Sequence, residues 1–173
     1  MPQSAPGQQK PKPILSLRGG PPGTEVTVVL TGLDAAQSVG IGFGSLSQYS
    51  GLGRGEAGPE GMMVANVAVP SWAELDRVHY FVLNLGNRSP RILSDPFYVT
   101  DAEGVAHIYG TVNDQGIGCL GLDGPEDVLY TLQGDHRKWT AGQRIRVVGT
   151  IADVEACDGQ GLPIAVREIQ PSL

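Results

Sequence analysis

The chain has 173 residues, including 25 glycines and 13 prolines, and its 18 acidic side chains outnumber 12 basic ones, for a net charge of −6. Only 17% of the residues are charged, against roughly 25% in typical domains, which favours short strands and turns over long solvated helices. This composition excludes a helical bundle, a coiled coil, a collagen and a protein with an apolar membrane span.

The acidic excess is shared by both halves of the chain. Residues 1–103 carry seven basic and nine acidic side chains, and residues 104–173 carry five and nine. The longest basic run is Arg137-Lys138. Because proteins neutralise nucleic-acid phosphates with clustered lysines and arginines, the sequence argues against a nucleic-acid partner.

Residues 1–12 are rich in Pro, Gln and Ser and are expected to form a disordered leader without signal-peptide character. Alternating apolar residues then predict strands over residues 14–17, 24–30, 39–43, 62–69, 79–85 and 97–99. The glycine-rich residues 44–61 show no periodicity and are expected to form a loop. Residues 71–74 (SWAE) have the form of a capping box, which predicts one helical turn or, alternatively, a turn packed by Trp72.

A linker or tight junction is expected at residues 101–104 (DAEG). Five further strands are predicted over residues 105–112, 117–122, 128–132, 144–154 and 163–169. The fourth is the longest and has Gly149 at its centre, and a glycine inside a strand often marks a bend at a barrel corner. Five short strands with a bent fourth predict a small closed barrel.

Residues 14–100 resemble the bacterial IPT/TIG immunoglobulin-like family. The resemblance rests on the turn Gly20-Pro21-Pro22-Gly23-Thr24 and on the closing segment Ser94–Thr100 (SDPFYVT). It departs from the family over residues 44–61, where the middle strands are hard to find. The resemblance implies a β-sandwich used for spacing, adhesion or carbohydrate display, with no catalytic residues.

Residues 105–170 resemble small exported bacterial domains of unknown function with an OB-like barrel. The matching features are Tyr109-Gly110-Thr111-Val112, Gly118-Cys119, Leu129–Leu132, Gly142–Thr150 and Cys157. The expected fold is therefore all-β, with an immunoglobulin-like sandwich over residues 13–101 and a five-stranded OB-like barrel over residues 104–173. The resemblance implies a cysteine pair and no established activity.

The two cysteines, Cys119 and Cys157, are placed to join two hairpin-like units of the barrel. Such a disulfide would stabilise the barrel by roughly 4 kcal/mol on a chain-entropy estimate. Because disulfides persist in oxidising compartments, the expected location is periplasmic or secreted. The alternative is a cytosolic protein with two buried free thiols.

Four residues of the barrel are candidates for a ligand-binding face: His107, Tyr109, Tyr130 and Trp139. His107 and Tyr109 alternate onto one side of a strand, and Tyr130 is expected to join Tyr109 from a neighbouring strand. Aromatic rings on such a face stack on bases or sugars. The alternative is that these rings cap or fill the barrel.

Acidic residues in two loops are candidates for a weak calcium site if Cys119 and Cys157 are joined: Asp123, Glu126, Asp127, Glu155 and Asp158. A solvated polar rim is the alternative. Residues 53–58 match G-x-G-x-x-G, but Pro59 and Gly61 follow where a dinucleotide site needs a helix. No zinc spacing or nucleophile motif is present, so no cofactor is expected.

The sequence predicts an exported bacterial protein that is no enzyme and acts as a binding or interaction module for a protein, peptide or saccharide. One alternative is a polysaccharide-active enzyme, or its accessory domain, that uses the interdomain junction. A second alternative is OB-type binding of single-stranded nucleic acid. The oligomeric state is left open.

Overall fold

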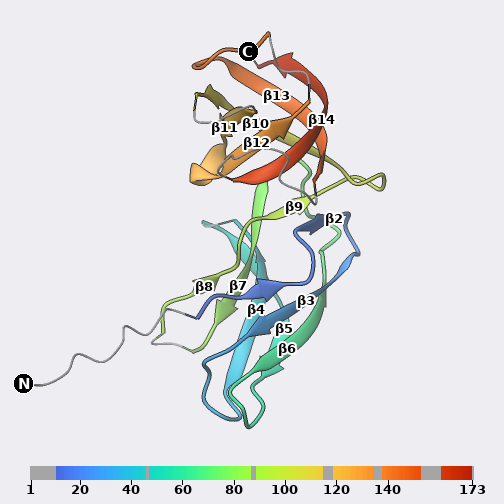
Figure 1. Ribbon diagram of the computed structural model, residues 1–173. Coiled ribbons are helices and arrows are strands. Elements are labelled where there is room, and N and C mark those ends of the chain that lie inside the picture. Colours follow the sequence, from blue (N-terminus) through green and yellow to red (C-terminus); the bar gives the residue numbers. More distant parts are fainter. Residues whose placement is uncertain are drawn as a thin grey trace, which may run out of the picture.

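A computed structural model describes residues 11–45, 47–86, 89–114, 119–134, 138–152 and 161–172. Over these residues the chain forms strands and one short 3₁₀ turn, η1 (Pro125–Asp127). The expected all-β fold, with a sandwich followed by a five-stranded OB-like barrel, is confirmed. Figure 1 shows the barrel stacked on one end of the sandwich.

The first unit consists of two sheets. The smaller sheet has the order β1-β3-β6, with β1 (Ile14–Leu15), β3 (Glu25–Leu30) and β6 (Met63–Ala68). The larger sheet has the order β2-β9-β7-β4-β5, with β2 (Gly19–Gly20), β9 (Phe97–Val99), β7 (Val78–Asn84), β4 (Ser38–Gly44) and β5 (Tyr49–Glu56). A short strand, β8 (Ile92–Leu93), pairs with β7.

Strict alternation places one face of β3 in the sandwich core. In β3, Val26, Val28 and Leu30 are fully buried, whereas Glu25 is exposed. The three buried residues of β3 belong to one cluster with the large rings of the facing sheet, Phe43, Phe81 and Phe97. Residues two apart in a strand share a face, so the pattern of the sequence directly produces this core.

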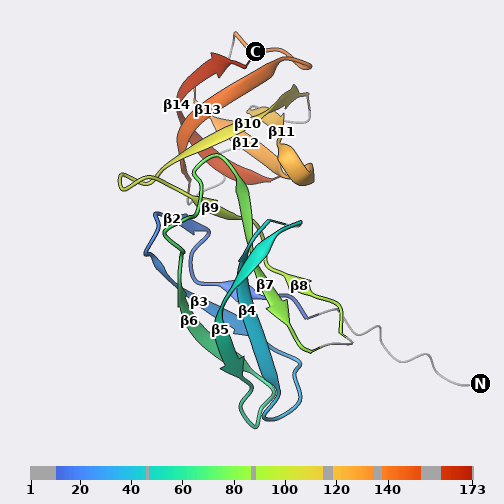
Figure 2. The ribbon, with the colours of Figure 1, turned by 180° about the vertical axis from the view of Figure 1, so that it is seen from behind.

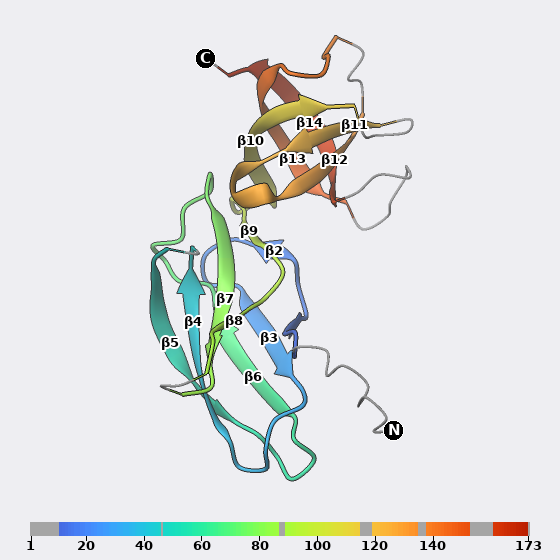
Figure 3. The same cartoon turned by 90° about the vertical axis from the view of Figure 1, so that its left-hand side faces the viewer.

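The second unit is a closed barrel with the order β10-β11-β12-β14-β13. Its strands are β10 (Val105–Asn113), β11 (Leu120–Asp123), β12 (Leu129–Gln133), β13 (Arg144–Ile151) and β14 (Leu162–Pro171). The strands β12 and β14 are parallel, and the other neighbours are antiparallel. Figure 3 shows the ring of strands from the side, above the start of β7.

The long fourth barrel strand is irregular at its predicted glycine. The pairing of β13 with β14 shifts register between Val148 and Gly149. A Cβ at Gly149 would lie 2.5 Å from the carbonyl oxygen of Ala165, so only glycine permits this close approach of the two backbones. The bend expected at Gly149 therefore coincides with a bulge.

In the first unit one local prediction is wrong, and at residues 71–74 the second of the two expected alternatives, a turn packed by Trp72, is confirmed. Residues 49–56, expected to belong to a loop, form the edge strand β5, which pairs with β4 along its length. Residues 71–74 form no helix: Trp72 lies in a turn, and the backbone N–H of Ala73 donates to the carbonyl of Pro70. The apolar continuation that a helix needs ends at Leu75, which leaves the turn as the stable form.

The segment between the two units is a tight turn. The side-chain oxygen Oδ1 of Asp101 accepts hydrogen bonds from the backbone N–H groups of Glu103 and Val105, at 3.0 and 2.8 Å. The backbone N–H of Asp101 also donates to the carbonyl of Val105. These bonds fix the course of the chain as it enters the barrel.

Candidate functional site

The two units share a hydrophobic core. The side chains of Val78, Tyr80, Val82 and Tyr98, from the first unit, belong to the same buried cluster as the barrel interior. Their neighbours along β7 and β9, which point the other way, fill the sandwich core. Six of the seven residues of β7 are therefore buried, because this strand has packing partners on both faces.

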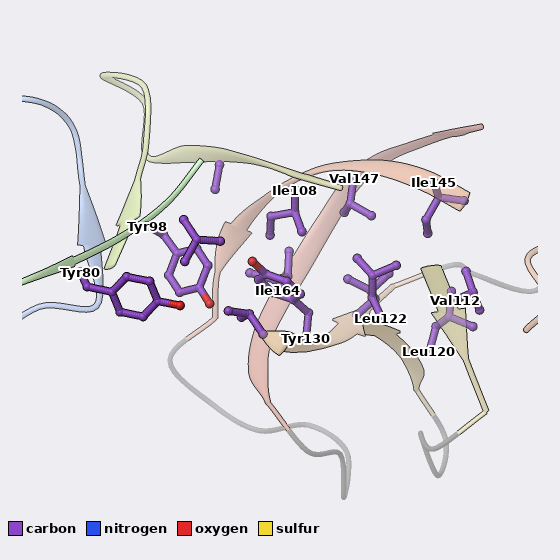
Figure 4. Close-up of a cluster of buried hydrophobic side chains, with 14 of the residues drawn as sticks. Tyr80, Tyr98, Ile108, Val112, Leu120, Leu122, Tyr130, Ile145, Val147 and Ile164 are labelled. Atoms are coloured by element: carbon purple, nitrogen blue, oxygen red, sulfur yellow. The ribbon is translucent and has the colours of Figure 1, made fainter. Parts of the chain in front are cut away.

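Two tyrosine contacts join the units across this core. The rings of Tyr98 and Tyr130 meet edge to face with centroids 5.6 Å apart, and the Tyr98 hydroxyl donates to that of Tyr130. The Tyr80 hydroxyl donates to the carboxylate of Glu126. Figure 4 shows Tyr80 and Tyr98 beside Tyr130 and Ile164, at one end of the barrel core.

The environment raises the pKa of these three phenols above the ordinary value of a tyrosine. Burial, together with the charge of Glu126, raises the pKa of Tyr80 to about 12. Burial likewise raises the pKa of Tyr130 to about 12 and also raises that of Tyr98. The hydroxyls thus stay protonated, and able to donate hydrogen bonds, well above neutral pH.

A cleft of about 770 Å³ opens beside the tyrosines, between the N-terminal segment of the sandwich and the underside of the barrel. Its apolar lining includes Ile14, Leu15, Val128, Leu129 and Leu162. Its charged lining comprises Lys12, Arg18, Asp95, Glu126 and Asp127. The sandwich supplies both cations, and the barrel supplies two of the three carboxylates.

Two of these carboxylates lie on a strained turn. Glu126 and Asp127 have φ values of 57° and 60°, in the left-handed region that side chains with a Cβ rarely adopt. Each such residue costs roughly 1–2 kcal/mol. The Tyr80 hydroxyl bonds to Glu126, and the Pro125 ring fixes the start of the turn, so both units hold this conformation. Strain of this kind clusters at functional sites.

The predicted ligand residues His107 and Tyr109 do lie together, on the outer face of β10. The Nη2 of Arg146, on the paired strand β13, lies within hydrogen-bond distance of the His107 Nδ1, at 3.2 Å. The Arg146 guanidinium also lies over the Tyr109 ring, 5.9 Å from its centroid, and its Nε is buried without a hydrogen-bond partner.

Tyr130 and Trp139 are placed differently. Tyr130 is 2% exposed and belongs to the barrel core, so the prediction that it joins Tyr109 on an exposed face is wrong. His107, Tyr109 and Tyr130 border a common cavity of only about 20 Å³, which has room for about one water molecule. Trp139 is partly buried and packs against the barrel core.

The predicted calcium ligands are described only in part. Asp123 accepts a 2.6 Å hydrogen bond from the Asn113 side chain, and Glu126 and Asp127 line the cleft. Glu155 and Asp158 lie outside the described residues. Within the described ranges, no three His, Cys, Asp or Glu side chains are grouped so that they could hold a metal ion. Calcium binding stays a prediction.

Cys119 is partly buried and immediately precedes β11. No free cysteine occurs among the residues that the structure describes. Its predicted partner Cys157 lies outside those residues, so the pairing stays a prediction.

The residues of the cleft were not among the candidates from the sequence. One signal was present: the segment Val78–Leu83 (VHYFVL) is apolar at most positions on both sides of the strand. Such a strand is buried on both faces, and this implies that something covers the outer face of the sandwich. The sequence pattern does not indicate that the barrel is what covers this face.

Comparison with known proteins identifies no relative: no family model, no curated protein and no solved structure matches this chain. The resemblances to the IPT/TIG family and to exported OB-like domains therefore stay predictions. In the described part of the chain, no helix has the length and apolar character that crossing a membrane requires.

Proposed function

We propose that this protein is a non-catalytic binding module that holds its ligand in the cleft between the sandwich and the barrel. The observation that carries the proposal is the shared core: the buried side chains of both units fix the two walls of a 770 Å³ cleft. Preformed clefts at domain interfaces are a preferred place for ligand sites.

The lining of the cleft favours a short extended peptide. Leu15, Leu129 and Leu162 offer an apolar floor for side chains. Arg18 on the sandwich side and Asp127 on the barrel side place opposite charges on the two walls. A peptide that carries both a carboxylate and an ammonium or guanidinium group matches this arrangement, because each charge then meets its complement.

The carboxylates of the cleft are better suited to binding than to hydrolysis. Asp95 is paired with Lys12 at 2.6 Å, and both side chains are about two-thirds exposed, at 68% and 64%. Glu126 already accepts a hydrogen bond from Tyr80. A general acid at neutral pH needs a carboxyl group in an apolar, buried environment, which supports the binding proposal over a glycosidase-like enzyme.

A nucleic-acid partner fits the described surface less well than a peptide does. Asp95, Glu126 and Asp127 would repel a phosphate backbone in the cleft. On the outer face of β11 and β12, where OB barrels bind oligonucleotides, the described residues Asp123, Thr131 and Gln133 include no aromatic ring on which a base would stack. The export of the protein remains part of the proposal and rests on the predicted disulfide.

The test is selection of a phage-displayed library of random linear peptides on the intact protein. The best peptide is then labelled with fluorescein, and its affinity is measured by fluorescence anisotropy. Asp127→Lys reverses an exposed charge on the barrel wall and should weaken binding about tenfold or more.

The control is Glu56→Lys, which makes the same exchange at an exposed residue of β5 outside the cleft. It should leave the affinity unchanged. Failure to enrich any peptide, or equal binding by Asp127→Lys and the original protein, would show that the cleft is not a peptide site.

A further inference from the structure

A second concave site lies at the end of the sandwich where the β4–β5 hairpin meets the start of β7. It has a volume of about 350 Å³ and includes Tyr49, Trp72, Glu74 and Arg77 in its lining. Figure 2 shows this hairpin and the start of β7 from behind, just below the barrel. We call this site the Trp72 groove.

The Trp72 ring is anchored on one side and open on the other. It is 49% exposed, although it packs against the rings of Phe43 and His79, with centroids 6.0 and 6.4 Å away. Phe43 and His79 are themselves buried. The indole is therefore held by the sandwich core while much of its surface faces solvent.

The second ring of the groove, Tyr49, is held in place as well. The Arg91 guanidinium lies over it, 4.8 Å from the ring centroid. On the β4 side the ring packs on Gly42, where a Cβ would lie 2.6 Å from Tyr49 Cδ2. Both aromatic rings of the groove thus have fixed positions before any ligand arrives, which lowers the entropy cost of binding.

Polar groups surround the two rings. The carboxylate of Glu74 forms an ion pair with the Nε of Arg77, and the Ser45 hydroxyl interacts with the backbone of Gln48. The side chains of Gln48, Glu74 and Arg77 supply amide, carboxylate and guanidinium groups at the same site. Together they offer both donors and acceptors, as a ligand with many hydroxyl groups requires.

We propose that the Trp72 groove binds a saccharide, with one pyranose ring seated on the exposed part of Trp72 and its hydroxyls bonded to the polar groups of the rim. The apolar C–H face of a sugar ring complements an aromatic surface, and its equatorial hydroxyls need the planar donors and acceptors that Gln48, Glu74 and Arg77 provide. A volume of 350 Å³ lies at the lower end of the range of ligand pockets, about 300–1,000 Å³, and suits one or two sugar rings.

The saccharide proposal does not rest on the peptide proposal, because the residues named for the two sites differ. The described carboxylate of the groove, Glu74, is paired with Arg77, so the site has no excess cation that would attract a phosphate or an acidic peptide. A neutral, polyhydroxylated ligand is the class that this charge balance favours.

The test begins with a printed array of plant, animal and bacterial glycans, probed with the full-length protein. Each glycan that binds is titrated in solution against the Trp139→Phe variant, in which Trp72 is the one remaining tryptophan. A saturable change in tryptophan emission is expected, because a sugar on the indole displaces water from it.

Trp72→Ala in the otherwise unchanged chain should weaken binding of the same glycan about tenfold or more. Its melting temperature should shift little, since half of the side chain is already exposed. Trp72→Tyr should restore part of the affinity, and Glu56→Lys, far from the groove, should change nothing. The proposal is overturned if no glycan binds, or if Trp72→Ala binds as tightly as the original protein.

Discussion

At the scale of single residues, the buried His79 has a titration that is coupled to folding. It is 4% exposed, and its ring stacks on Phe43 with centroids 5.0 Å apart. Its Nδ1 donates to the carbonyl of Arg77 at 2.9 Å. Burial lowers the pKa of His79 below 6.5, and the bond to the Arg77 carbonyl and the charge of Glu74 only partly oppose this.

The lowered pKa predicts a loss of stability in mild acid. At a pH between 6.5 and the lower pKa that His79 has in the folded protein, His79 is protonated in the unfolded chain but not in the folded one. The free energy of unfolding therefore falls as the pH drops below about 6.5. Urea unfolding between pH 7.5 and 5 should show this fall. His79→Phe should flatten it, and the control His107→Gln should not. A pH dependence that is the same with and without His79 would refute the assignment.

The sequence located some of these residues and not others, for physical reasons. Alternation alone placed His107 and Tyr109 on the outer face of β10, and the structure agrees. It gave the wrong side for Tyr130, because a tyrosine fits either face of a strand and its partner Tyr98 lies in the other unit. Trp72 was noted in the sequence only as a packing residue, since its exposure depends on the course of the turn.

At the scale of elements, the strand β5 shows why a strand rich in glycine is missed when strands are predicted from apolar alternation. Its residues Gly51, Gly53 and Gly55 occupy every second position, as apolar residues would in an ordinary strand. Gly55 lies against Met63, where a Cβ would lie 2.8 Å from Met63 Cγ. Backbone pairing with β4 forms the strand, and the hydrophobic pattern that identifies strands in a sequence is missing.

The short strand β2 (Gly19–Gly20) is a second strand whose glycines hide the usual apolar pattern, and it makes a contact between the two units. A Cβ at Gly19 would overlap the Ile151 side chain of the barrel and lie 2.6 Å from the carbonyl oxygen of Tyr98. The barrel therefore packs directly on the backbone of β2. The sequence predicted only a turn at these glycines, because the need for a small residue comes from a strand that lies 132 positions further along the chain.

This contact predicts that Gly19→Val destabilises the protein. The added side chain must displace the Tyr98 carbonyl of β9 as well as the Ile151 side chain of the barrel, and overpacking of this kind typically costs about 1–3 kcal/mol. The midpoint of urea unfolding should fall accordingly. Gly51→Val is the matched control, because a Cβ at Gly51 meets nothing within 4 Å. If both variants unfold at the same urea concentration, Gly19 is not packed closely between β9 and the barrel as described.

At the scale of the whole molecule, the sandwich and the barrel are two different folds that share one buried cluster. The sequence separated them correctly into two fold types, because each has its own series of alternating strands. It indicated that something covers the outer face of the sandwich but not that the barrel does, since Val78, Tyr80 and Tyr98 would alternate in the same way whatever covered them. The cleft exists only because the two units pack together, so the sequence patterns could not predict it.

Docking through a shared core also defines how the molecule should unfold. Removing the barrel would expose Tyr80, Tyr98 and Val82, and removing the sandwich would expose Tyr130 at the end of the barrel. Each fully buried large side chain contributes about 1.5–3 kcal/mol. Loss of either unit therefore destabilises the other, and the two should unfold together.

The most direct test of this account is urea unfolding followed separately in each unit. In the Trp139→Phe variant the remaining Trp72 reports on the sandwich, and in the Trp72→Phe variant the remaining Trp139 reports on the barrel. The account predicts that the two fluorescence transitions coincide, and that adding Tyr130→Ala lowers both midpoints together. Two separate transitions, with the sandwich midpoint unaffected by Tyr130→Ala, would contradict it.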